Sequence, residues 1–170
     1  MILIARINSG LFCFMKITLI QIGKTHFDFV DEGFDMFAKR LKHYCKFEAH
    51  MIELPSKLKT TDIELIKKNE GELLLKKITS NDFMILLDEN GKEYHSKEFA
   101  QFIQKQSLHQ SSLTFVVGGA YGFSKEIYNR ANTQLSLSKM TFSHQLIRLI
   151  FAEQLYRAFS IIKGEPYHHE

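Results

Sequence analysis

The stretch SLSKMTFSHQLIRLIFAEQLYRAF, residues 136–159, places a hydroxyl-rich loop with almost no charge directly before a long apolar segment. Projected at about 100° per residue, the apolar side chains of this segment cover most of the circumference of a helix. Glu153, Arg157 and Ser160 share one narrow polar strip. A helix that is apolar on nearly all sides is expected to be covered on both sides. We therefore predict a homodimer in which this helix supplies the contact face.

The polar strip has two interpretations. Glu153 and Arg157 are spaced i,i+4, so they can form an ordinary helix ion pair that contributes about 0.2–0.5 kcal/mol. If the strip is instead buried in an interface, a role in a functional site becomes the better interpretation.

The loop before the helix also has two interpretations. Ser138 and Thr141 offer hydroxyl groups, and Met140 and Phe142 offer apolar walls. This mixture suits an adenosine-like ligand better than a triphosphate, which favours Lys and metal-binding carboxylates. Alternatively, Thr141 or Ser143 caps the amide groups at the beginning of the helix.

Working outward from this stretch, strand-like and helix-like segments alternate along the chain. The predicted strands cover residues 16–22, 46–54, 83–88, 113–117 and 134–138. The predicted helices cover 27–44, 61–78, 96–106 and 125–131, followed by the final long helix. Ser124 is placed to cap the helix that follows it, and ENGKEY, residues 89–94, is predicted to be a turn. This alternation predicts one α/β domain with a mainly parallel sheet and helices on both faces.

In parallel sheets of this kind, ligands bind outside the carboxyl ends of the strands. Leu87 with Asp88, Gly118, and the loop after the fifth strand are therefore candidate positions. The segment VVGGAYGFS, residues 116–124, allows close approach of backbone to a ligand, or it is simply a tight turn. It does not have the GxGxxG pattern, and no acidic residue follows about twenty positions later, which disfavours a nicotinamide-binding domain.

The composition sets broad limits. The net charge of +3 permits an RNA partner without arguing for one. Cys13 and Cys45 are too few for a disulfide framework or a metal cluster, so we expect a cytoplasmic protein without a metal. No apolar run approaches the ~20 residues that span a bilayer, so no membrane partner is expected.

The first residues are unlike the rest of the domain. Residues 1–14 are apolar but have neither a basic start nor a cleavage signal, and a second Met and the first strand follow them directly. We interpret residues 1–14 as an N-terminal extension and 15–170 as the domain, with a cleaved signal peptide as the alternative.

The last residues, GEPYHHE at 164–170, also have two interpretations. Chain ends are usually untethered. Alternatively, Tyr167, His168 and Glu170 fold over a site, where Tyr167 supplies an aromatic face for a base and His168 an imidazole.

Three segments together resemble the bacterial ribosomal RNA large-subunit methyltransferase H family: FVVGGAYGFSKEIY, LSLSKMTFSHQLIRLIFAEQLYRAF and the terminal KGEPYHHE. The likeness covers residues 15–170. It implies a single-domain SPOUT, or α/β-knot, fold with a five- to six-stranded sheet and a C-terminal trefoil knot. It also implies methylation of N3 of a pseudouridine in 23S rRNA, with S-adenosylmethionine as the methyl donor.

The resemblance further implies site residues. The positions that match donor contacts are Leu87, Gly118, Leu137, Ser138, Lys139, Met140, Thr141 and Phe142. For catalysis we expect Arg157 to stabilise negative charge on the base and Tyr167 to stack on it. Glu153 or His168 would accept the proton, and which of the two does so stays open.

The substrate is expected to be an assembled ribosome or large subunit, because the Lys and Arg residues are too scattered to grip free RNA. Two alternatives remain open. One is a methyltransferase of the same fold that acts on tRNA. The other is a nucleotide-binding α/β module without catalysis that uses GGAYG for phosphate and does not need the C-terminal tail.

Overall fold

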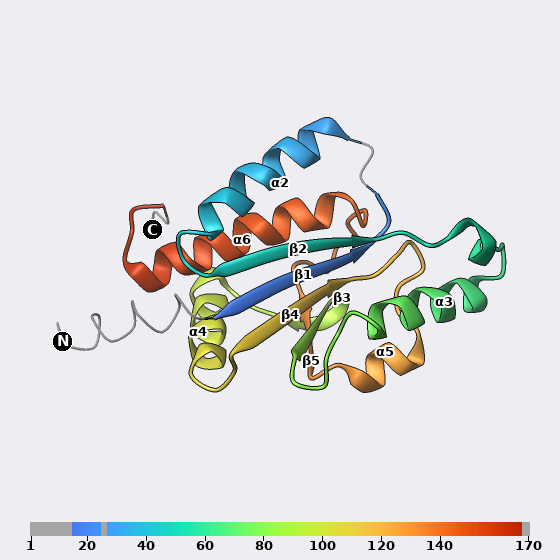
Figure 1. The fold of residues 1–170 in the computed structure, drawn as a ribbon. Helices are drawn as coiled ribbons and strands as arrows, with labels where there is room; N and C mark the ends of the chain where they lie inside the picture. The colour runs from blue at the N-terminus through green and yellow to red at the C-terminus, as the bar shows by residue number, and fades with distance from the viewer. Residues whose placement is uncertain (1–14, 25–26, 168–170) are drawn as a thin grey trace.

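The computed structural model describes residues 15–24 and 27–167, and Figure 1 shows the fold. The expected N-terminal extension lies outside the described residues. The strands are β1 (Lys16–Ile22), β2 (Lys46–Ile52), β3 (Phe83–Glu93), β4 (Ser112–Val117) and β5 (Thr133–Ser136). The helices are α2 (Asp28–Leu41), α3 (Ile63–Leu75), α4 (Ser96–Ser107), α5 (Lys125–Arg130) and α6 (Leu146–Lys163), with a short 3₁₀ helix, η2 (Ser56–Leu58).

The five strands form one sheet in the order β2-β1-β4-β3-β5, and every neighbouring pair is parallel. The central strands β1 and β4 are buried along almost their whole length. Both faces of such strands meet helices, which explains their continuous apolar runs. The predicted parallel α/β architecture is therefore confirmed.

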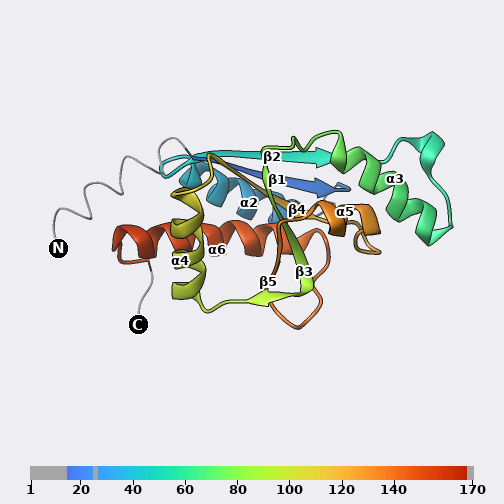
Figure 2. The same cartoon turned by 90° about the horizontal axis from the view of Figure 1, so that it is seen from below.

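Helices cover both faces of the sheet (Figures 1 and 2). On one face, α2, α4 and α6 bury a core that contains Phe34, Ile103 and Phe151 together with Phe115 of β4. On the other face, α3 and α5 bury a smaller core around Leu74 and Ile127. None of the described helices has both the length and the apolar character needed to cross a bilayer.

Contacts with other helices of the same chain account for most of the apolar circumference of α6. The helix packs against both α2 and α4, and no residue of α6 before Lys163 is exposed. Leu146 and Ile150 are half-buried but do not belong to the core. They lie on the outward side of the helix at i,i+4, and Glu153 and Arg157 continue the same face. This strip is thus the part of α6 that remains available for a contact outside the chain.

The predicted turn at 89–94 is wrong, because β3 continues through most of it to Glu93. After a register shift, Lys92 pairs with Leu135 and Glu93 with Ser136 of β5. The irregularity is held by the amide of Asn90, which donates to Oδ1 of Asp88 at 2.8 Å. The turn residues therefore make a bulge within a strand rather than a strand end.

Candidate active site

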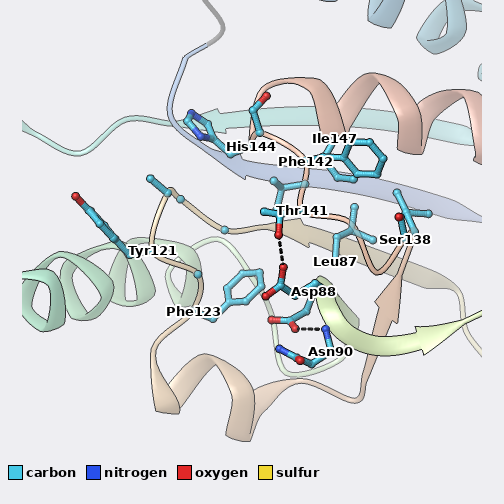
Figure 3. A pocket seen from close by; sticks show the side chains of 18 of the residues that line it. Leu87, Asp88, Asn90, Tyr121, Phe123, Ser138, Thr141, Phe142, His144 and Ile147 are labelled. Carbon is cyan, nitrogen blue, oxygen red and sulfur yellow. Dashed lines mark hydrogen bonds between the residues drawn. The ribbon is translucent and has the colours of Figure 1, made fainter.

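A cavity of about 670 Å³ opens beside the bulge of β3 and the carboxyl ends of β4 and β5 (Figure 3). This is the position where open parallel sheets bind ligands. Its volume lies within the range of small-molecule sites, roughly 300–1,000 Å³. The edge of the sheet and the size of the cavity therefore define a site for one small organic ligand.

Most of the residues predicted to contact a donor line this cavity: Leu87, Gly118, Leu137, Ser138, Met140, Thr141 and Phe142. Lys139 does not line it. Its side chain is 85% exposed, and its Nζ lies 3.7 Å from Oε2 of Glu93 in a neighbouring polar depression. The Lys139 side chain therefore lies outside the cavity, beside solvent and an acidic partner, and its expected contact with the donor stays a prediction.

The loop after β5 is fixed by its own hydroxyl groups. Oγ of Ser136 donates to the carbonyl of Ser138 at 2.9 Å, and Oγ of Ser138 accepts from the amide of Met140 at 2.9 Å. Thr141 does not cap α6, since its hydroxyl donates to Oε2 of Glu89 at 2.7 Å (Figure 3). Oγ of Ser143 accepts from the amide of Leu146 at 3.2 Å. The capping interpretation therefore holds for Ser143, and the loop that precedes it lines the cavity.

The turn after β4 forms another wall of the cavity. The amide of Gly122 donates to the carbonyl of Gly119 at 3.2 Å, and Gly122 has a φ of 77°. The segment GGAYG, residues 118–122, is thus a tight turn that also lines the cavity. Ser124 occupies the predicted position before α5, although its hydroxyl makes no capping hydrogen bond.

The charge of the cavity is negative. Asp88 and Glu89 are among its lining residues, which include no Lys or Arg in the described chain. Tyr128 donates to Oδ2 of Asp88 at 2.6 Å. Burial and this carboxylate together raise the pKa of Tyr128, so its phenol stays a neutral donor. A site of this kind favours a cationic ligand and disfavours phosphate.

Three of the four predicted catalytic residues form a second cluster. Nη2 and Nε of Arg157 donate to Oε1 of Glu153 at 2.5 and 3.1 Å, and the hydroxyl of Tyr167 donates to the same oxygen at 3.1 Å. The Arg157 guanidinium lies over the Tyr167 ring, 4.9 Å from its centroid. Burial, followed by the charge of Glu153, raises the pKa of Tyr167. The fourth predicted residue, His168, lies outside the described residues.

This cluster does not reach the cavity within one chain. Ile147, in the first turn of α6, lines the cavity, whereas Glu153, Arg157 and Tyr167 do not. At about 1.5 Å per residue, Glu153 and Arg157 lie roughly 9 and 15 Å further along the helix axis than Ile147. Within one chain, the residues predicted to contact the donor and the residues predicted for catalysis therefore lie apart.

The start of the C-terminal tail is tethered. Gly164 ends α6 with a φ of 68°, and the amide of Glu165 donates to the carbonyl of Ser160 at 2.9 Å. Tyr44, in the turn after α2, donates a hydrogen bond to the carboxylate of Glu165. The ring of Tyr167 packs edge-on against Tyr156 with centroids 4.7 Å apart. As far as residue 167, the interpretation of an untethered tail is therefore wrong.

Some site residues were not predicted. Glu89, Asn90, Tyr121, Phe123, His144 and Ile147 also line the cavity. Glu89 and Asn90 directly follow the predicted third strand, so the rule of strand ends applied to them as well. Tyr44 carried no local signal, because its partner Glu165 lies 121 residues away.

A parallel α/β domain with an acidic cavity at one edge of the sheet, bounded by a hydroxyl-rich loop and a glycine turn, belongs to the class of α/β proteins that bind one small organic ligand. Comparison with known proteins makes this specific: the family model described as "Predicted SPOUT methyltransferase" matches residues 15–168. The chain belongs to the SPOUT methyltransferase family, and the resemblance seen in the sequence is confirmed.

Similar proteins cover nearly the same length. One from Christiangramia forsetii, named ribosomal RNA large subunit methyltransferase H, is 50% identical over 156 residues, which are 91% of this chain and 99% of the relative. Relatives of the same name from Parabacteroides distasonis and Cytophaga hutchinsonii are each 48% identical. The matches span 92% and 91% of this chain and the full length of both relatives.

Proposed function

We propose that this chain is an S-adenosylmethionine-dependent methyltransferase that modifies N3 of a pseudouridine in 23S rRNA. The observation that carries the proposal is the acidic cavity bounded by Leu87, Gly118 and the loop residues Leu137, Ser138, Met140, Thr141 and Phe142. The names of the relatives, which specify methylation of large-subunit ribosomal RNA, support the same substrate class.

The cavity fits the methyl donor better than a nucleotide phosphate. The bound donor would supply a methyl group on a positively charged sulfonium. Asp88 and Glu89 give the cavity the opposite charge, and Met140 and Phe142 give it apolar walls. A phosphate group would find no Lys or Arg there, which weighs against the alternative of a phosphate-binding module.

The catalytic cluster has the groups that methylation of an imide nitrogen requires. The reaction forms an N–CH₃ bond, breaks the S–CH₃ bond, and releases the N3 proton, leaving S-adenosylhomocysteine. Arg157 would stabilise the negative charge on the carbonyl oxygens of the base, and Tyr167 would stack on its ring. Glu153 or His168 would accept the proton. Methyl transfer also requires alignment of the nitrogen with the methyl group. The loop at 137–142 would hold the donor in the position that this alignment needs.

A homodimer would bring the two clusters together. In one chain the cavity and the Glu153–Arg157–Tyr167 cluster are separated along α6, so a complete site needs a second surface. Leu146 and Ile150 form a half-buried apolar strip that continues into Glu153 and Arg157. Pairing two copies through this strip places the catalytic cluster of one copy in the interface, where the cavity of the other can approach it.

The substrate is proposed to be an assembled ribosome or large subunit. Several of the available cations are already paired: Lys46 with Glu48 at 3.9 Å, and Lys139 with Glu93 at 3.7 Å. Free RNA would be held mainly through its phosphates by such side chains. We therefore expect naked RNA to be a poor substrate. Residues 15–170 would form the catalytic domain, and the family match from residue 15 supports this.

Isothermal titration calorimetry tests the donor assignment. S-adenosylmethionine should bind the purified protein, and flavin mononucleotide and ATP should bind far more weakly, because the cavity is acidic. Tight binding of either phosphate ligand without binding of S-adenosylmethionine would overturn the proposal in favour of a nucleotide-binding module.

A further inference from the structure

Glu70 of α3 lies directly behind the turn that forms one wall of the donor cavity. The residue is only 9% exposed, and its Oε2 is buried without a hydrogen-bond partner among the described residues. A Cβ atom added to Gly119 would lie 2.5 Å from Oε2 and 2.7 Å from Oε1 of Glu70. The carboxyl group therefore packs against the backbone of the turn, and only glycine leaves room for it.

The neighbouring residue of α3, Gly71, also lies close to the segment that follows the turn. A Cβ atom added to Gly71 would lie 2.7 Å from Oγ of Ser124, which shows how closely the helix approaches the segment after the turn. Because interiors are close-packed, a change in the size or solvation of the Glu70 carboxyl must move the turn or the helix.

The surroundings of Glu70 favour the protonated carboxyl. Burial raises its pKa. Lys67, the one other titratable residue that lines this crevice in the described chain, forms an ion pair with Glu64 at 3.1 Å. From the turn and α5, the crevice is lined by residues without titratable side chains: Gly118, Gly119, Gly122, Phe123, Ser124 and Ile127. An ionised Glu70 would thus be a buried charge with no compensating partner on the facing elements.

We propose that Glu70 is a positioning residue for the donor cavity: its neutral carboxyl supports the Gly118–Gly119 turn from behind, and its ionisation releases the turn. The inference rests on the proposed function for the identity of the ligand. The direction in which donor affinity changes with pH follows from the linkage between protonation of Glu70 and the conformation of the turn. A carboxyl whose pKa is raised in the well-formed state stabilises that state at low pH. The support is lost as the pH rises through the raised pKa, so donor affinity falls.

The test measures the dissociation constant of S-adenosylmethionine from about pH 5 to pH 8 for wild type, Glu70→Gln and Glu70→Ala. Wild-type affinity should fall with rising pH. Glu70→Gln, which keeps the shape and stays neutral, should hold the low-pH affinity throughout. Glu70→Ala should be weaker at every pH, on the order of ten-fold. Asp88, Glu89 and His144 are present in all three proteins, so the difference between wild type and Glu70→Gln isolates the contribution of Glu70.

A double-mutant cycle with Gly119→Ala tests the contact itself. The added methyl group should weaken donor binding because it meets the Glu70 carboxyl. In Glu70→Ala those oxygen atoms are absent, so the double variant should lose less affinity than the product of the two single losses. Additive losses together with equal pH profiles for wild type and Glu70→Gln would overturn the inference. So would a loss in Glu70→Gln equal to that in Glu70→Ala, which would make the negative charge the essential property.

Amide hydrogen exchange of residues 118–122 without ligand separates this inference from the proposed function. Protection of the turn should decrease with rising pH in wild type, after correction for intrinsic exchange, and should not do so in Glu70→Gln. If the wild-type protein fails to bind S-adenosylmethionine, the proposed function fails, and the exchange data still decide whether Glu70 controls the turn.

Discussion

At the scale of single residues, the arrangement around Glu153 is the most informative. Its Oε1 accepts from Arg157 and Tyr167, and its Oε2 accepts from Nε2 of Gln154 at 2.6 Å. The i,i+4 spacing predicted the contact between Glu153 and Arg157, whereas the approach of Tyr167 depends on the turn at Gly164. The Glu153–Arg157 pair therefore differs from an ordinary i,i+4 ion pair on a helix surface, because it also fixes the position of the Tyr167 ring.

Arg157→Lys should lower the turnover number about 100-fold and leave the affinity for S-adenosylmethionine unchanged. Lysine keeps the charge, but it loses the planar donor group that contacts Glu153 and covers Tyr167. Lys163→Ala at the exposed end of α6 is the matched control and should behave as wild type. Turnover of Arg157→Lys equal to that of wild type would remove Arg157 from the catalytic cluster.

The sequence predicted residues that line the cavity where a general rule applied. Leu87 and Gly118 were found because parallel strands present their carboxyl ends at one edge. The sequence did not show that the Lys139 side chain lies outside the cavity, since its direction depends on Glu93, a residue of β3. Tyr44 was missed because its contact with Glu165 exists only in the folded chain. Local patterns do not contain such long-range contacts.

At the scale of elements, one hydrogen bond links the loop at 137–142 to β3. The Thr141 hydroxyl reaches Glu89, and both residues line the cavity. The loop was predicted as a ligand site, but its attachment to β3 was not, because the predicted β3 ended before Glu89. The longer strand follows from pairing of Lys92 and Glu93 with β5, a tertiary contact that overrides the turn propensity of Asn90 and Gly91.

Thr141→Val should weaken binding of S-adenosylmethionine about five- to ten-fold, as expected for loss of one hydrogen bond to a carboxylate. Valine keeps the shape of threonine, so the change reports on the bond rather than on packing. Lys139→Ala, which removes only the exposed ion pair with Glu93 on the same loop, serves as the control, and calorimetry should give an affinity within two-fold of wild type. Equal affinities for Thr141→Val and wild type would mean that donor binding does not need the hydrogen bond from Thr141 to Glu89.

At the scale of the whole molecule, the assembly of two copies is the main prediction. The apolar character of α6 suggested it, yet α2 and α4 cover most of this helix. Two observations still favour a dimer: the outward strip of Leu146 and Ile150, and the separation of the cavity from the catalytic cluster within one chain. The trefoil knot implied by the family resemblance stays a prediction.

Ile150→Glu should convert the dimer to a monomer in light scattering, because it places an unpaired charge in the proposed interface. Methyl transfer should be lost with it, and binding of S-adenosylmethionine should persist, since one chain supplies all the cavity residues described above. Leu108→Glu, at an exposed position just after α4, is the control and should remain dimeric and active. A monomeric wild type with full activity would refute the two-chain site.

The most direct measurement is transfer of labelled methyl from S-adenosylmethionine to ribosomes purified from a strain that lacks this modification. The full chain and a chain truncated after Gly164 are compared, with donor binding measured for both. We predict incorporation into 23S rRNA by the full chain and none by the truncated chain, with donor binding retained. Incorporation into tRNA in place of 23S rRNA, or no incorporation by the full chain, would contradict the proposed function. Equal incorporation by both chains would exclude the tail from the catalytic site.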